Sequence, residues 1–68
     1  MDYIDSIVPN VKRIIEEKGL KKKKVAEIAG YSEQAFSSML NGRRMIDAND
    51  VWYISQALGV TPNDLYGI

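Results

Sequence analysis

Apolar residues recur along this 68-residue chain at the three- and four-residue spacing of helices, in short blocks that end at single glycines. No alternating run of apolar and polar residues, of the kind that forms strands, lies between these blocks. The pattern therefore predicts an all-α fold in which residues 1–68 form one compact domain. The predicted helices cover residues 7–18, 22–29, 33–41, 48–58 and 62–66.

The first predicted helix starts after Ser6, a candidate N-cap, so that Pro9 falls in the first turn, where a missing N–H costs little. Residues 1–6 are then expected to form a flexible lead-in. Gly19 ends this helix, and Leu20 is expected to pack back towards the core. The other apolar positions predicted to face the core are Ile7, Val11, Ile14, Ile15, Val25, Ala26, Ile28, Ala29, Phe36, Met39, Leu40, Val51, Ile54, Ala57, Leu58, Val60 and Leu65, with Met45 or Ile46.

Small polar residues and glycines mark the ends of the later helices. Gly30 favours a left-handed turn at a helix C-terminus, and Ser32 is a suitable N-cap for the next helix. Asp47 and Thr61 are the corresponding caps of the fourth and fifth helices, each followed three residues later by an acid. Residues 25–44 thus predict a helix-turn-helix, whose second helix can lie in a DNA major groove.

The amino-acid inventory excludes most catalytic and metal-binding chemistry. The chain has neither histidine nor cysteine, and its glycines stand singly instead of forming a phosphate-binding loop. No enzyme activity, metal, cofactor or small-molecule ligand is therefore expected. The apolar runs are too short to span a membrane, and the N-terminus lacks the basic start of a secretory signal. We therefore expect a cytoplasmic, nucleoid-associated protein.

Positive charge is concentrated in two places, although the formal net charge is zero. Four lysines, Lys21–Lys24, stand at the start of the second helix, where the helix dipole favours anions. Two interpretations remain open: a solvated basic face, or a helix end that binds an external phosphate. Asn41 likewise either caps the third helix or, with nearby backbone N–H groups, binds phosphate. The candidate phosphate-binding residues are Lys21, Lys22, Lys23, Asn41, Arg43 and Arg44.

The exposed side of the third helix carries polar side chains that can pair with the edges of bases. Gln34 can bond both N6 and N7 of adenine, and Glu33 can accept a hydrogen bond from N4 of cytosine. Glu33 also has a purely structural explanation, because an acid in the first turn stabilises a helix. The candidate base-reading residues are Gln34, Glu33, Ser37 and Ser38.

Four segments, in their order and spacing, resemble the Cro/C1-type helix-turn-helix family of phage and bacterial repressors, also called the XRE family: EEKGL, VAEIAG, YSEQAFSSMLNGRR and ALGVTPNDLY. The resemblance implies a five-helix, lambda-repressor-like fold. It also implies sequence-specific binding of double-stranded DNA by a small transcriptional regulator, a repressor of phage or mobile-element type. Gln34 would be the leading base reader, and Lys22 would clamp a phosphate where the family often has Gln. The lysine run and the acidic Glu33 depart from the family pattern.

The resemblance further implies a weak homodimer on a palindromic operator, because one unit that reads one half-site binds weakly. The candidate dimer contacts are Trp52, Tyr53, Tyr66 and Ile68. Trp52 and Tyr66 can instead complete a thin core. An antitoxin-like or adaptor module that binds proteins is the alternative function, based on the neutral net charge, Glu33 and the aromatic residues.

Overall fold

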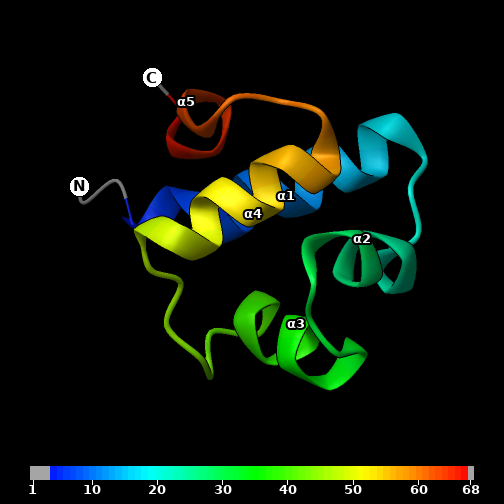
Figure 1. The fold of residues 1–68 in the computed structure, drawn as a ribbon. Helices are drawn as coiled ribbons and strands as arrows, with labels where there is room; N and C mark the ends of the chain where they lie inside the picture. Colours follow the sequence, from blue (N-terminus) through cyan, green and yellow to red (C-terminus); the bar gives the residue numbers. More distant parts are fainter. Residues whose placement is uncertain (1–3, 68) are drawn as a thin grey trace.

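The computed structural model describes residues 4–67, except for the side chains of residues 4–6. This part of the chain is helical and contains no strand, so the predicted all-α class is confirmed. Its five helices, shown in Figure 1, are α1 (Ile4–Lys18), α2 (Lys22–Ala29), α3 (Glu33–Leu40), α4 (Ala48–Leu58) and α5 (Pro62–Tyr66). The predicted bounds of α2, α4 and α5 are confirmed, while α3 ends one residue earlier than predicted.

The start of α1 differs from the prediction. The helix begins at Ile4, so the proposed cap at Ser6 is wrong, and the lead-in does not extend as far as residue 6. Pro9 lies inside the helix instead of in its first turn, at a position where an N–H would normally bond the carbonyl four residues earlier. Ile7 and Val11 flank Pro9 and are fully buried. Packing of this apolar stripe therefore sustains the helix in spite of the missing hydrogen bond.

The predicted N-caps of the later helices are confirmed. The side chain of Ser32 accepts a 3.1 Å hydrogen bond from a backbone N–H of α3. Asp47 and Asp50 cap α4 reciprocally, since the side chain of each accepts from the backbone N–H of the other. Thr61 and Asp64 form the same arrangement at α5. These bonds satisfy helix N–H groups that have no partner within the helix, so they fix where each helix starts.

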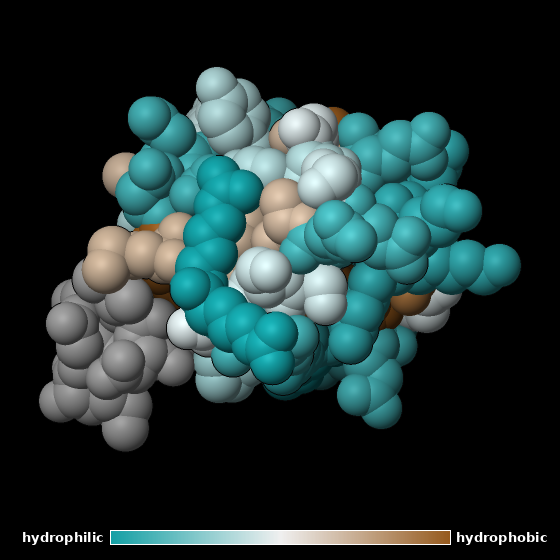
Figure 2. All heavy atoms as spheres, turned by 90° about the horizontal axis from the view of Figure 1, so that it is seen from below, coloured by the Kyte–Doolittle hydropathy of each residue, from teal (hydrophilic) through white to brown (hydrophobic). Residues whose placement is uncertain are grey.

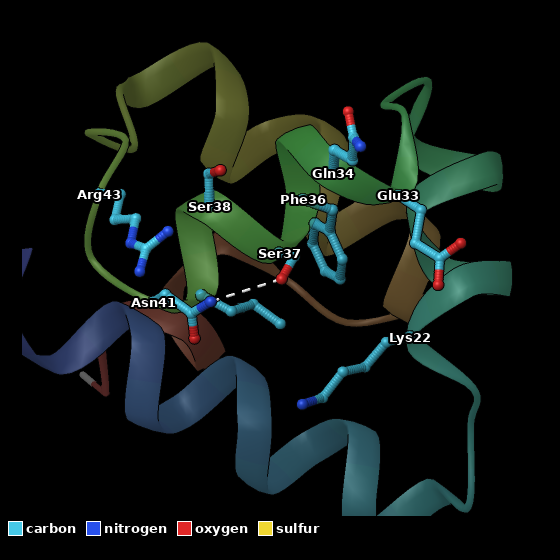
Figure 3. Close-up of a pocket in the computed structure, with 9 residues that line it drawn as sticks. Lys22, Glu33, Gln34, Phe36, Ser37, Ser38, Asn41 and Arg43 are labelled. Carbon is cyan, nitrogen blue, oxygen red and sulfur yellow. Dashed lines mark hydrogen bonds between the residues drawn. The ribbon is translucent and has the colours of Figure 1, made fainter.

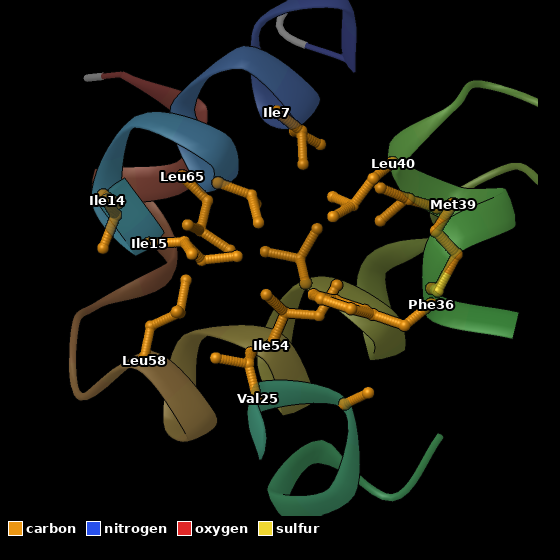
Figure 4. Packing of buried hydrophobic residues seen from close by; sticks show 14 residues of the cluster. Ile7, Ile14, Ile15, Val25, Phe36, Met39, Leu40, Ile54, Leu58 and Leu65 are labelled. Carbon is orange, nitrogen blue, oxygen red and sulfur yellow. The ribbon is translucent and has the colours of Figure 1, made fainter. Parts of the chain in front are cut away.

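The buried core lies between all five helices, as Figure 4 shows. It contains the predicted residues of α1, α3 and α5, and Ile46 turns inward from the loop while Met45 is 82% exposed. Leu20 and Ile28 contradict the prediction, because they are 39% and 60% exposed. The buried side of α2 is centred between Val25 and Ala26, and Ile28 points roughly 110° away from that centre at 3.6 residues per turn. Leu20 stays at the surface in the short connection between α1 and α2.

The packing of the helices leaves α3 at the surface. α5 packs against α1 and α4 on one side of the molecule, whereas α2 and α3 lie on the other side (Figure 1). α2 also contacts α4, and α3 contacts α1. The outer face of α3 is thus exposed, while its inner face packs against α1 and α2. Among residues 4–67, no helix is long and apolar enough to cross a membrane.

Candidate nucleic-acid interface

A tight turn joins α2 to α3. Gly30 adopts a left-handed conformation with φ of 90°, which costs a glycine little. The next N–H, that of Tyr31, donates a 2.9 Å hydrogen bond back to the carbonyl of Ala26. With Ser32 as the cap, α3 starts at Glu33, four residues after α2 ends. The two helices therefore have the arrangement of a helix-turn-helix.

A groove runs along the exposed side of α3. Seen from the side on which α3 lies, the molecular surface is mostly hydrophilic (Figure 2). The groove is lined by residues from α2, from α3 and from the loop after it, drawn in Figure 3: Lys22, Glu33, Gln34, Phe36, Ser37, Ser38, Leu40, Asn41 and Arg43. All four predicted base-reading residues and three of the six predicted phosphate-binding residues thus line one hollow.

The side chains of α3 point to two different sides. Gln34 and Ser38 point to one side of the helix, whereas Glu33 and Ser37 point to the side on which Lys22 lies (Figure 3). The amide of Asn41 donates a 3.4 Å hydrogen bond to the hydroxyl of Ser37. Asn41 therefore contacts Ser37 on the side that faces Lys22, while Gln34 and Ser38 point to a neighbouring side of the helix. This division was not part of the sequence prediction.

The N-terminus of α2 has no side-chain cap, in contrast to α3, α4 and α5. The capping position is held by Lys21, whose side chain makes no capping hydrogen bond. Of the four exposed lysines, Lys22 lines the groove, and Lys24 pairs with Glu27 of its own helix at 3.8 Å. Lys21 and Lys23 are exposed outside the groove in the described part of the chain. Of the three predicted phosphate-binding lysines, Lys22 therefore lines the groove itself, while phosphate binding by the exposed Lys21 and Lys23 stays a prediction.

The backbone after α3 is already hydrogen-bonded. The N–H groups of Asn41, Gly42, Arg43 and Arg44 donate to carbonyls of α3 at distances of 2.9 to 3.3 Å. They are not available to a phosphate, so the idea that backbone N–H groups near Asn41 bind one is wrong. Asn41 occupies the C-cap position of α3 and its side chain is exposed. A phosphate at this end of the groove would therefore have to be bound by side chains.

A second cluster, not predicted from the sequence, is centred on Tyr31 in the turn between α2 and α3. The hydroxyl of Tyr31 donates a hydrogen bond to Oδ1 of Asp50, and the guanidinium of Arg44 lies 5.7 Å from the centre of the Tyr31 ring. Tyr31 also stacks on the buried Phe36, with ring centres 6.5 Å apart, so the cluster adjoins the core. No local pattern could have indicated it, because Tyr31 and Asp50 are 19 positions apart.

The pKa values in this cluster follow from its contacts. Burial, together with the hydrogen bond to Asp50, raises the pKa of the Tyr31 hydroxyl far above its ordinary value. Burial would also raise the pKa of the Asp50 carboxyl, but hydrogen bonds from Tyr31 and Asp47 outweigh it and hold that pKa below the ordinary value. The pair therefore keeps a protonated tyrosine and an ionised aspartate over a wide pH range.

The candidate dimer contacts fall into three groups. Trp52 and Tyr53 on α4 are 54% and 52% exposed, so Trp52 does not complete the core. Tyr66 is half-buried and packs against the core. Ile68 lies outside the described residues. Among the candidates in the described part of the chain, Trp52 and Tyr53 are thus the ones exposed enough for a contact with another molecule.

Comparison with known proteins agrees with this geometry. The helix-turn-helix family model matches residues 11–65, from the middle of α1 to α5. The uncharacterized HTH-type transcriptional regulator y4dJ of Sinorhizobium fredii is 35% identical over 65 residues, which are 96% of this chain and 84% of that protein. No solved structure matches. With this match over most of its length, the chain belongs to the helix-turn-helix family of the Cro/C1 type.

Proposed function

We propose that this protein is a transcriptional regulator that binds double-stranded DNA in a sequence-specific manner, with α3 in the major groove. The observation that carries the proposal is the groove along α3. Side chains that can pair with bases line this groove, and a cationic side chain stands at each of its two ends. The name of the relative from Sinorhizobium fredii, a transcriptional regulator, supports it.

Base recognition falls to the exposed side chains of α3. The major groove of B-DNA is about 12 Å wide and admits one helix. Gln34 carries an amide that both donates and accepts, as the N6 and N7 edge of adenine requires. Ser38 lies on the same side and is permissive in what it bonds. Glu33 repels phosphate and accepts a hydrogen bond only from a donor such as cytosine N4. It therefore disfavours DNA sequences that place a base without such a donor opposite it.

Phosphate binding falls to the two ends of the groove. At one end, Lys22 stands in the first turn of α2, whose free N–H groups and positive dipole end favour an anion. At the other end, Asn41 and Arg43 line the groove with side chains that suit phosphate oxygens. Contacts on both sides of α3 would fix its depth and orientation in the DNA.

A repressor of phage or mobile-element type, acting as a weak homodimer on a palindromic operator, is the finer form of this proposal. It rests on the family resemblance and on the exposed Trp52 and Tyr53, since aromatic residues are enriched in protein contacts. Two copies related by a twofold axis would each place one α3 in successive major grooves, about 34–36 Å apart.

Selection from a library of random duplexes tests the proposal. We expect enrichment of one short motif, repeated in inverted orientation with centres about 10 base pairs apart. Failure to enrich any motif at low salt would overturn sequence-specific binding, and a motif without an inverted repeat would overturn the dimer. Capture of a stable protein partner through α3, with duplex DNA competing poorly, would instead favour the adaptor function.

A further inference from the structure

The two consecutive arginines after α3 have different surroundings. The backbone N–H groups of both residues donate to the carbonyl of Ser38, that of Arg43 at 2.9 Å and that of Arg44 at 3.2 Å. The backbone from which both side chains extend is therefore held against α3. The side chain of Arg43 lines the groove along α3. The guanidinium of Arg44 instead lies over the ring of Tyr31, outside that groove.

We infer that Arg44 is a positioning residue, held by the ring of Tyr31 beside the Asp50 carboxylate, and that Arg43 alone of this pair binds a DNA phosphate. This inference rests on the proposed function. The face of an aromatic ring attracts a guanidinium, and a neighbouring carboxylate adds to that attraction. The positive charge of Arg44 in turn helps to hold the pKa of Asp50 low. A phosphate that approached Arg44 would also meet the negative charge of Asp50, which repels it.

The same contacts explain what Arg44 positions. The loop between α3 and α4 is fixed at its start by the bonds to Ser38 and at its end by the capping pair of Asp47 and Asp50. Between these two ends, Arg44 ties the loop to the helix-turn-helix through Tyr31. Loss of the contact between Arg44 and Tyr31 would make the loop, and the side chain of Arg43 on it, less well positioned, although no phosphate ligand would be removed.

The matched substitutions Arg43→Gln and Arg44→Gln test this assignment, because they remove the same charge one position apart. Affinity for the selected duplex is measured over a series of salt concentrations. We expect Arg43→Gln to reduce the slope of log affinity against log salt by about one. Arg44→Gln should lower affinity roughly two- to five-fold at every salt concentration and leave the slope unchanged. A slope reduced by about one in Arg44→Gln would overturn the inference.

A second measurement needs no DNA. The urea midpoints of the wild type, Arg44→Gln, Tyr31→Leu and the double variant form a double-mutant cycle. We expect Arg44→Gln to lower the midpoint in the wild type and to have less effect in Tyr31→Leu. Equal effects in both backgrounds would show that Arg44 is not held by Tyr31. A wild type that binds no duplex would defeat the proposed function, while the cycle would still decide whether Arg44 depends on Tyr31.

Discussion

The side-chain amide of Asn10 donates a 2.8 Å hydrogen bond to the backbone carbonyl of Leu65, 55 residues later in the chain. The bond ties the middle of α1 to α5, whose five residues are too few to form a stable helix alone. Leu65 itself is fully buried, so its carbonyl lies close to the core. Asn10 therefore secures the C-terminal end of the fold from within α1.

Substitution of Asn10 by alanine should destabilise the protein. Loss of one partly buried hydrogen bond lowers the free energy of unfolding by about 0.5–1.5 kcal/mol. Urea unfolding measures the change. The exposed Asn49 of α4 provides a control of the same residue type, and Asn49→Ala should leave the midpoint nearly unchanged. Equal midpoints for Asn10→Ala and the wild type would contradict a role for this bond.

Stability should decrease in strong acid. The pKa of Asp64 is held below its ordinary value by hydrogen bonds from Thr61, and that of Asp50 is also lowered. Below about pH 4 the unfolded chain therefore takes up protons that the folded chain does not, and the free energy of unfolding falls. Chemical unfolding between pH 2 and pH 7 measures it. Asp50→Asn should reduce the acid-dependent loss, and an unchanged pH profile in this variant would contradict the assignment.

Stability should also decrease in alkali, through Tyr31. Its pKa is raised in the fold, so above about pH 10 the unfolded chain loses a proton that the folded chain keeps. Tyr31→Phe removes this contribution and should make the alkaline decrease less steep. The exposed Tyr53 serves as the control, because Tyr53→Phe leaves the bond to Asp50 intact. A variant Tyr31→Phe as sensitive to alkali as Tyr53→Phe would argue against the raised pKa.

Gln34 should determine base preference. Gln34→Ala removes the amide that the proposed adenine contact requires, and it should cost ~1–3 kcal/mol on the selected site and less on other sequences. Its salt dependence should stay as in the wild type, since no charge is removed. Fluorescence anisotropy with the selected and a scrambled duplex measures both. Gln56 on α4 is an exposed control, and an equal loss in Gln56→Ala would rule out a specific role for Gln34.

Trp52 should contribute to self-association. Since its side chain is 54% exposed, Trp52→Ser should change the free energy of unfolding little while it weakens the dimer. Sedimentation equilibrium with and without the selected duplex measures the association. Met45, which is 82% exposed on the loop, provides an apolar control. A dimer that persists in Trp52→Ser would place the contact elsewhere on the surface.

The sequence predicted the helix ends well where short-range chemistry decides them. Ser32, Asp47 and Thr61 bond backbone groups within three residues, so their effect is visible in a local window. The start of α1 was mispredicted because Ser6 and Pro9 form a plausible local start, whereas the helix begins at Ile4 and carries Pro9 in its interior.

The candidate interface was predictable in its residue types but not in its arrangement. Helical spacing was enough to indicate the exposed polar side of α3. It did not indicate that Ser37 bonds Asn41, or that Arg43 and Arg44 have different partners. The contact of Arg44 depends on Tyr31, in the turn before α3, and on a carboxylate of α4. Such relationships arise only when the chain is folded.

The most direct test of DNA binding is the salt dependence of affinity for the selected duplex, measured for the wild type, Lys22→Gln and Lys24→Gln. We expect log affinity to fall linearly with log salt in the wild type, with a clear preference for the selected over a scrambled duplex. Lys22→Gln should reduce this slope by about one, whereas Lys24→Gln, whose lysine pairs with Glu27, should change it less. Absence of binding at low salt, or an affinity independent of salt, would contradict the proposed DNA binding.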